Sequence, residues 1–280
     1  MVRFLFLCEK RRNFMKYTLD HLYGIEGQVI VVTGGSDGIG RGLAGALADL
    51  GACVGILSLV PEACDKAAQE ICDRGGRAVS APANVANEQE VAAAFRKVYE
   101  HFGRIDGLVN VAGINHIGQL AQQDMDDWKQ VLDVNLLGTV LCTREAGRYM
   151  LEAGHGRVVN ISSWASVCGK PGYSAYTASK GAVNAFTQCM AIEWSRRDIN
   201  VNAIAPVMVI TDINRKQIAD NPGYLERVIA GIPQGRTCQV EYLVGPVVYL
   251  LSASSTFMTG QTLFVDGGCT AGDVHLIKPE

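Results

Sequence analysis

The sequence predicts a single α/β domain built on a doubly wound, seven-stranded parallel sheet. Short apolar runs, several of them β-branched, alternate with longer stretches of helical periodicity along most of the 280 residues. Strict alternation favours a parallel sheet with helices on both faces, because right-handed crossovers return each strand to the same direction. A glycine-rich turn directly after the first run is the second observation, since such sheets bind ligands at the ends of their strands.

The individual elements follow in order from local sequence. Residues 29–32 are a β-branched run, and the helix after them places Leu43, Leu47 and Leu50 on one face. The next helix opens with Pro61 and Glu62, residue types favoured in a first helical turn. We predict strands at 29–32, 53–57, 77–81, 105–111, 157–161, 200–205 and 262–265. We predict helices at 40–50, 61–72, 88–101, 127–151, 174–195 and 239–251.

One domain is predicted at residues 25–270, with an N-terminal extension at 1–24 and a C-terminal tail at 271–280. No linker, repeat or low-complexity tract divides it. Residues 211–235 interrupt the alternation with polar side chains and the turn-forming run Asn221-Pro222-Gly223. Segments of this kind often close over a bound substrate, so we predict a lid there.

Composition argues against several classes of partner. Apolar residues make up 48% of the chain and the formal net charge is −3, which leaves no basic excess for nucleic-acid phosphates. No apolar run reaches the ~18 residues of a membrane span. The nine cysteines form no C-x-x-C pair, and the five histidines show no ligand spacing. We therefore predict a cytoplasmic protein with reduced thiols, no metal, no membrane partner and a small-molecule substrate.

The glycine-rich turn after the first strand is Thr33-Gly34-Gly35-Ser36-Asp37-Gly38-Ile39-Gly40. Glycines let the chain turn sharply and let its backbone approach a pyrophosphate. The helix that follows directs free N–H groups and the positive end of its dipole at such an anion. The spacing is G-x-x-x-G-x-G and differs from the common G-x-G-x-x-G. Its place between the first strand and the first helix nevertheless predicts a dinucleotide site.

Further motifs follow in a fixed order: Asn110-Val111-Ala112-Gly113, Asn135, Ser163, Tyr176-Thr177-Ala178-Ser179-Lys180 and Val265-Asp266-Gly267-Gly268. With the glycine-rich turn, they resemble the single-domain form of the short-chain dehydrogenase/reductase family over about residues 27–268. The resemblance implies a Rossmann-like fold, an NAD or NADP cofactor, and interconversion of a secondary alcohol and a ketone. It also implies a homotetramer.

Tyr176 and Lys180 lie four residues apart on a predicted helix, so their side chains share one face. A free tyrosine has a pKa of about 10, and proton exchange near neutral pH requires a much lower value. The ammonium of Lys180 and a positive nicotinamide ring would together favour the phenolate. The resemblance implies that Ser163 binds the substrate oxygen and that Asn135 helps to hold a water beside Lys180. Ser162 would point the other way if the strand continues.

The choice between NAD and NADP stays open. An acid at the end of the second strand would select NAD, and Ser58 stands there. Family members that use NADP usually place Arg or Lys where this chain has Leu59 or Asp37. Val207 replaces the usual glycine after the sixth strand, so we expect a different turn there. The resemblance implies further cofactor contacts at Asn84, Val85, Asn110, Ala112, Gly113, Tyr176, Lys180, Val209 and Thr211, beside Gly34, Ser36, Asp37, Gly38, Ile39, Gly40 and Ser58.

We expect a polar hydroxy compound, a sugar acid or a polyol, contacted by residues 115–116, 164–172 and the lid. The run Ile232-Pro233-x-Gly235-Arg236 is similar to polyol and gluconate dehydrogenases of the family. One alternative is a 3-oxoacyl–acyl-carrier-protein reductase, which would dock its acidic carrier on two arginines; Arg197 fits one position, and Gly154 stands at the other. A second alternative is a non-catalytic NAD(P)-sensing regulator, which the presence of Tyr176 and Lys180 disfavours.

Overall fold

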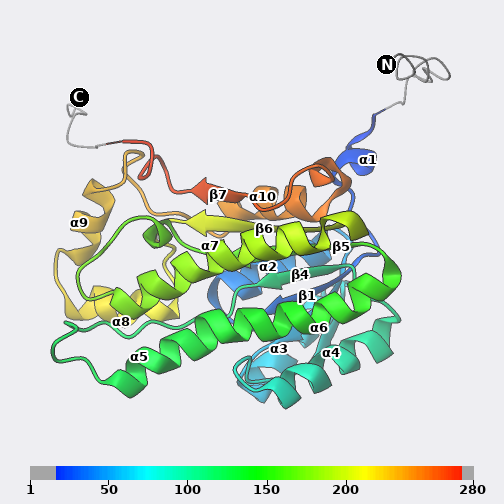
Figure 1. Ribbon diagram of the computed structural model, residues 1–280, viewed down its shortest axis with the longest axis horizontal. Coiled ribbons are helices and arrows are strands. Elements are labelled where there is room, and N and C mark those ends of the chain that lie inside the picture. Colours follow the sequence, from blue (N-terminus) through cyan, green and yellow to red (C-terminus); the bar gives the residue numbers. More distant parts are fainter. Residues whose placement is uncertain (1–16, 273–280) are drawn as a thin grey trace, which may run out of the picture.

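The computed structural model describes residues 17–272, and its centre is a seven-stranded parallel sheet in the order β3-β2-β1-β4-β5-β6-β7 (Figure 1). The strands are β1 (Val29–Thr33), β2 (Cys53–Leu57), β3 (Arg77–Ser80), β4 (Gly107–Asn110), β5 (Gly156–Ile161), β6 (Ile199–Pro206) and β7 (Thr262–Val265). The helices are α1 (Leu19–Tyr23), α2 (Gly38–Asp49), α3 (Pro61–Asp73), α4 (Glu88–Phe102), α5 (Met125–Leu132), α6 (Gly138–Ala153), α7 (Ser174–Trp194), α8 (Asp212–Asp220), α9 (Tyr224–Ala230) and α10 (Glu241–Leu251). The predicted doubly wound sheet is confirmed.

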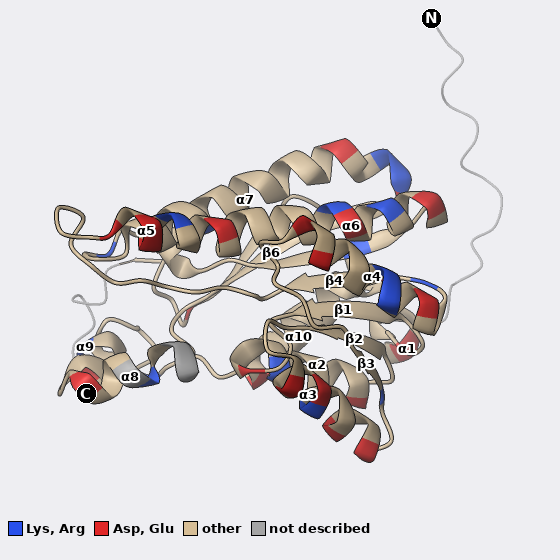
Figure 2. Ribbon diagram, turned by 90° about the horizontal axis from the view of Figure 1, so that it is seen from below, with Lys and Arg blue, Asp and Glu red and all other residues tan. Residues whose placement is uncertain are grey.

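Two helical layers enclose the sheet: in Figure 2, α4, α6 and α7 lie above the strands, and α2, α3 and α10 lie below them. Successive residues of a strand point to opposite faces, and β1 divides its apolar side chains accordingly. Ile30 and Val32 join the core under α2, α3 and α10, whereas Val29 and Val31 join the core under α4, α6 and α7. The strands β1, β2, β4 and β6 are buried on both faces, which explains why the sequence shows continuous apolar runs there rather than alternation.

The helix predicted at 127–151 is interrupted by a π-helical segment, η1 (Asp133–Leu137), between α5 and α6. A π-helical turn holds one residue more than an α-helical turn and occurs frequently at functional sites. Here it places Asn135 facing inward, with none of its surface exposed. The hydroxyl of Thr139 donates to the Asn135 carbonyl at 2.8 Å. Apolar periodicity, which changes little over one widened turn, does not reveal this irregularity.

The strand arrows of β6 and β7 in Figure 1 point toward α8 and α9, which occupy the predicted lid at 211–235. The predicted extension lies partly outside the described residues. Within its described part, α1 packs beside the turn after α10, where the hydroxyl of Ser254 donates to the Leu22 carbonyl at 2.8 Å. The boundaries of the extension and the lid stay predictions. No described helix combines the length and the apolarity that crossing a bilayer requires.

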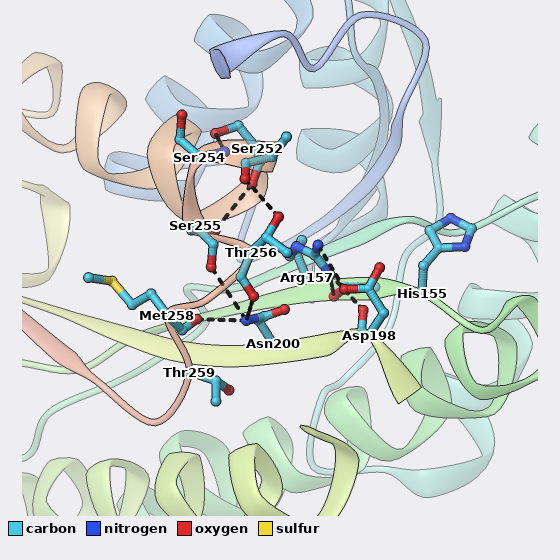
Figure 3. A network of polar contacts seen from close by, with 12 residues as sticks. His155, Arg157, Asp198, Asn200, Ser252, Ser254, Ser255, Thr256, Met258 and Thr259 are labelled. Atoms are coloured by element: carbon cyan, nitrogen blue, oxygen red, sulfur yellow. Dashed lines mark hydrogen bonds and ion pairs between the residues drawn. The ribbon is translucent and has the colours of Figure 1, made fainter. Parts of the chain in front are cut away.

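The opposite end of β6 is held by a polar network (Figure 3). The buried side-chain amide of Asn200 donates to the carbonyls of Ser255, Thr256 and Met258 at 3.4, 3.1 and 2.8 Å. Just before it, Asp198 has a φ of +52°, a conformation that costs a non-glycine residue energy. Arg157 holds that residue by donating to its carbonyl at 2.7 Å and to its carboxylate at 3.2 Å. These bonds fix the start of β6 and therefore the direction in which it reaches the site.

Replacing Asn200 by alanine is expected to lower the free energy of unfolding by roughly 1–3 kcal/mol, because buried carbonyls lose their donor. Urea unfolding followed by circular dichroism measures the loss. Gln69→Ala is the matched control, since its amide donates only to Asp73 on the surface of α3; we expect a change within about 0.5 kcal/mol. An Asn200→Ala protein that unfolds at the wild-type urea concentration would show that the network does not hold β6.

Candidate active site

A cavity of about 500 Å³ lies at the carboxyl ends of the central strands, between the sheet and the helices α8 and α9. One wall is formed by Ser163, Tyr176 and Lys180, with Gly113 beside them. Thr211, the first residue of the predicted lid, lines it as well. Ligands of doubly wound sheets bind outside the carboxyl ends of the strands, so this is the expected place for a reaction site.

Helix α7 and the segment after β5 bring Tyr176, Lys180 and Ser163 together. Helix α7 carries the first two on one face, with the Lys180 ammonium nitrogen 5.8 Å from the centre of the Tyr176 ring. Ser163 follows β5 and forms a side-chain hydrogen bond with Tyr176. Its neighbour Ser162 instead donates to the Lys180 carbonyl at 3.3 Å. The geometry therefore favours Ser163 over Ser162 as the serine that faces the reacting hydroxyl.

Burial has the largest effect on the pKa values of Tyr176 and Lys180. It raises the pKa of Tyr176, and the hydrogen bond with Ser163 opposes that effect. It lowers the pKa of Lys180 to about 8, and the Lys180 ammonium donates to the Ile161 carbonyl at 2.7 Å. The ammonium is thus present at neutral pH and is lost as the pH rises through about 8. In the protein by itself the phenol pKa is raised rather than lowered, because desolvation of the phenolate outweighs the favourable contacts.

Asn135 links three segments behind Lys180. Its Oδ1 accepts from the Ile114 amide at 2.8 Å, and its Nδ2 donates to the Ile114 carbonyl and to the Ser179 hydroxyl, both at 3.0 Å. A side chain at Gly113 would bring its Cβ to 3.2 Å from this Oδ1 and to 3.7 Å from the Lys180 nitrogen. Gly113 therefore leaves the space in front of both polar groups open. The bridging water implied by the family resemblance stays a prediction.

The glycine-rich turn has the backbone geometry that a dinucleotide phosphate requires. Gly34 has a φ of +64°, and a Cβ there would lie 3.0 Å from the backbone of Ala112. Gly38 begins α2 with a φ of +50°, and a Cβ there would lie 3.0 Å from the Thr211 side chain. The Thr33 hydroxyl accepts from the amides that follow β4 at 3.0 and 3.1 Å, which keeps the two loops together. These residues fit a pyrophosphate at the start of α2.

The end of β2 carries hydroxyl groups where an acid would select NAD. The side chains of Ser36 and Ser58 hydrogen-bond to each other. Asp37 is turned toward the helix, where its carboxylate accepts from the Gly38 amide at 2.6 Å. Arg41 forms an ion pair with Glu70. The nearby charges are therefore engaged within the protein, and the choice between NAD and NADP stays open.

The other predicted cofactor residues divide into two groups. Val209 and Ile39 line the cavity, and Gly40 lies within the first turn of α2. Asn110 does not line it, because its side chain faces α6 and β5, where its Nδ2 donates to Thr143 at 3.0 Å and to Asn160 at 2.9 Å. Asn84 and Val85 also lie outside the cavity lining.

Local contacts explain the positions of Asn84, Val85 and Val207. The side-chain oxygen of Asn84 accepts from the Ala86 amide at 3.0 Å, so it shapes its own turn. Val85 is buried against Gly138 of α6. Val207, where we expect a different turn, directly follows β6 and stays beside β7, since its amide donates to the Val265 carbonyl at 3.2 Å. It needs no positive φ, which explains why valine is accepted there.

Sequence reasoning did not single out a cluster that joins the loop before α7 to the lid. We call it the Lys170 cluster, and it comprises Lys170, Tyr173, Gln217 and Tyr224. The Tyr173 hydroxyl donates to Gln217 at 3.0 Å, and the Lys170 ammonium donates to the Tyr224 hydroxyl at 2.8 Å. Lys170 lies within the predicted stretch 164–172, but its hydrogen-bond partner Tyr224 is 54 residues away. Local spacing gives no signal for such a contact, because Gln217 and Tyr224 lie on the lid, far from Lys170 and Tyr173 in the sequence.

Among residues 17–272, no group of histidine, cysteine, aspartate or glutamate side chains converges as a metal site would. Residues 33–270 match a family model described as enoyl-(acyl carrier protein) reductase. A 3-oxoacyl-[acyl-carrier-protein] reductase of Synechocystis sp. is 39% identical over 243 residues, which cover 86% of this chain and 96% of that protein. Gluconate 5-dehydrogenase of Gluconobacter oxydans is 35% identical over 249 residues, which cover 89% and 97%.

A solved structure is similar over the same range. The gluconate 5-dehydrogenase of Burkholderia cenocepacia, in complex with NADP and tartrate, superposes with a TM-score of 0.86 at 36% identity. The match covers 90% of this chain and 98% of that one. This chain therefore resembles dehydrogenases and reductases in sequence and in fold over nearly the whole length of both proteins.

Gly34→Ala is expected to weaken NADPH and NADH binding at least tenfold, because the added methyl group meets the backbone of Ala112 and closes the approach to the phosphates. Fluorescence titration of the reduced cofactor measures the dissociation constant. Gly75→Ala is the matched control: its φ of +85° is equally unusual, but a Cβ there meets nothing within 4 Å. Both variants share the backbone strain, so equal dissociation constants in the two proteins would contradict the assignment of this turn.

Proposed function

Because this chain belongs to the short-chain dehydrogenase/reductase family, we propose that it interconverts a secondary alcohol and a ketone on a polyhydroxylated compound, a sugar acid or a polyol. The chain is an NAD(P)-dependent oxidoreductase for an alcohol/ketone pair. The observation that carries the finer proposal is the lining of the cavity around Tyr176. Among the mostly apolar side chains of the lining, Asn115, Gln217 and Tyr224 offer hydrogen-bonding groups to the hydroxyl groups of such a substrate.

The bound cofactor supplies the hydride in the reducing direction and accepts it in the oxidising direction. Tyr176 would donate its hydroxyl proton to the carbonyl oxygen of the ketone, so that one hydride and one proton give the alcohol. Ser163 would donate a hydrogen bond to the same oxygen and hold it beside the phenol. In the reverse direction the Tyr176 phenolate would take the proton of the alcohol.

Lys180 would favour the phenolate that Tyr176 becomes after giving up its proton. Its ammonium is present below a pH of about 8 and lies one helical turn away. Asn135 would support this arrangement by fixing the loop after β4 and the Ser179 hydroxyl around Lys180. These roles are inferred from the positions of the four side chains and from the family resemblance.

The names of similar proteins support a hydroxylated substrate. They include gluconate 5-dehydrogenase, 5-keto-D-gluconate 5-reductase of Escherichia coli and D-threitol dehydrogenase of Mycolicibacterium smegmatis. The solved gluconate 5-dehydrogenase holds tartrate, a hydroxylated dicarboxylate, together with NADP. The compounds in these names are all polar, hydroxylated molecules of four to six carbons.

A 3-oxoacyl–acyl-carrier-protein reductase is the second candidate, favoured by the 39% identity to such an enzyme. The proposed docking arginine, Arg197, lies on the exposed turn after α7. Gly154, at the other docking position, ends α6 with a φ of +75° and offers no cation. A panel of 5-ketoaldonates, ketoses and 3-oxoacyl thioesters, each assayed with NADH and NADPH, separates the candidates. Exclusive turnover of the thioesters would overturn the sugar-acid or polyol proposal.

We further propose a cytoplasmic homotetramer. Along α7 Lys180 and Glu193 are the only charged residues, and Figure 2 shows the helix uncharged over most of its length, with Ile192 80% exposed. Phe257, near β7, is fully exposed and supports a second contact. Eight cysteines among the described residues are free thiols, which suits a reducing compartment. Light scattering of the purified protein measures the assembly, and cell fractionation measures the location.

Tyr176→Phe is expected to lower turnover by roughly 10²- to 10⁴-fold while the NADPH dissociation constant changes little, because only the proton donor is removed. Initial rates and cofactor titration of the same preparation measure both quantities. Tyr99→Phe, which removes an exposed hydroxyl on α4, is the control and should match the wild type. Full turnover after loss of the Tyr176 hydroxyl would exclude this tyrosine as the acid/base. Cofactor binding without turnover of any substrate by the wild type would instead support a sensor.

A further inference from the structure

Three cationic side chains line the cavity: Lys180, Lys170 and Arg227. Among the side chains that the structure describes, no carboxylate lines it with them. Lys180 is buried beside Tyr176, whereas the mechanism makes no use of the other two. Within residues 17–272, neither Lys170 nor Arg227 forms an ion pair with a described carboxylate. Among the described side chains, the positive charge of Lys170 and Arg227 has no carboxylate partner.

Lys170 is held in place by two aromatic rings. Its ammonium nitrogen lies 4.2 Å from the centre of the Tyr173 ring and 5.1 Å from that of the Tyr224 ring, and it donates to the Tyr224 hydroxyl. Aromatic faces attract a cation without neutralising it. An ammonium has three donors, and Tyr224 uses one of them. Lys170 can thus bind an anion without leaving its position, so little side-chain entropy is lost on binding.

Lys170 and Tyr176 lie close enough for one small molecule to contact both. The rings of Tyr173 and Tyr176 are 6.3 Å apart, and Lys170 lies 4.2 Å from the former. The sum of these distances, 10.5 Å, is the greatest possible separation between the Lys170 ammonium and the centre of the Tyr176 ring. A short hydroxy acid, with a hydrogen bond of about 3 Å at each end, can reach both groups within that limit. Arg227 reaches the same cavity from α9, on the lid side.

We propose that Lys170 determines specificity by binding the carboxylate of an anionic hydroxy acid, with Arg227 as a second cation on the lid, while Tyr176 faces the reacting carbon. This inference rests on the proposed function and narrows it from sugar acids and polyols to the acids. A charge-assisted hydrogen bond to the carboxylate would favour the acid over its neutral amide by roughly 10- to 100-fold.

The test uses 5-ketogluconate and its carboxamide as a matched pair, with Lys170→Met and Lys170→Arg. We expect Lys170→Met to lower kcat/KM for the acid by roughly 10- to 100-fold and to bring the acid-to-amide ratio close to one. Lys170→Arg should keep most of the preference for the acid. Lys97→Met, which removes an exposed charge from α4, controls for net charge and should leave the ratio unchanged.

Tyr224→Phe separates recognition of charge from a structural role. It removes the hydroxyl that Lys170 contacts but keeps the ammonium, so the acid-to-amide ratio should remain above one. Equal loss of both activities in Lys170→Met, or the same change of ratio in Tyr224→Phe, would mean that Lys170 only holds the lid and would overturn the inference. Thermal melting shows whether each variant is folded.

A binding measurement keeps this inference separate from the proposed function. Trp164 lines the cavity, so its fluorescence can report binding of tartrate to the NADP-loaded protein. Tartrate should bind at least tenfold more weakly to Lys170→Met than to the wild type. Unchanged tartrate affinity would overturn the carboxylate site, whatever the substrate. Turnover restricted to 3-oxoacyl thioesters, with Lys170-dependent tartrate binding intact, would overturn the proposed function and leave the anion site standing.

Discussion

The burial of a lysine and a tyrosine side by side is the constraint on which the rest of this site depends. Removing Lys180 from water disfavours its charge, yet the proposed chemistry needs the ammonium. The hydrogen bond from the Lys180 ammonium to the Ile161 carbonyl, at the end of β5, helps to stabilise the charged form. That bond holds only if α7 lies tightly on the sheet, so the packing of one helix sets the proton affinities of both groups.

Several features of the fold serve this constraint. The π-helical segment between α5 and α6 directs Asn135 toward the loop after β4, and Gly113 keeps the space before it free. The polar network around Asn200 fixes the start of β6. The segment that follows this strand places Val209 and Thr211 in the lining of the cavity. Polar residues distant from the chemistry thereby contribute to its geometry.

The lid links the proton chemistry to substrate choice. The Lys170 cluster joins the loop before α7 to α8 and α9, and Tyr173 of that cluster packs edge-on against Tyr176. A substrate that reached both Lys170 and Tyr176 would therefore contact the lid and the sheet at once. Such a design favours substrates with a charged or strongly polar group at a set distance from the reacting carbon.

The sequence by itself determined the fold class, the glycine-rich turn and the grouping of Tyr176 with Lys180, because each depends on local periodicity or on spacing along one element. It could not reveal the inward turn of Asn135, since one widened turn is too short to stand out in the apolar periodicity of a long helical stretch. It also could not show that Asn110 faces α6, because an apolar strand buried on both faces gives no sign of which way a polar residue points. Only the tertiary structure brought Lys170 to Tyr224, since contacts between residues far apart in the chain arise from packing and not from local sequence.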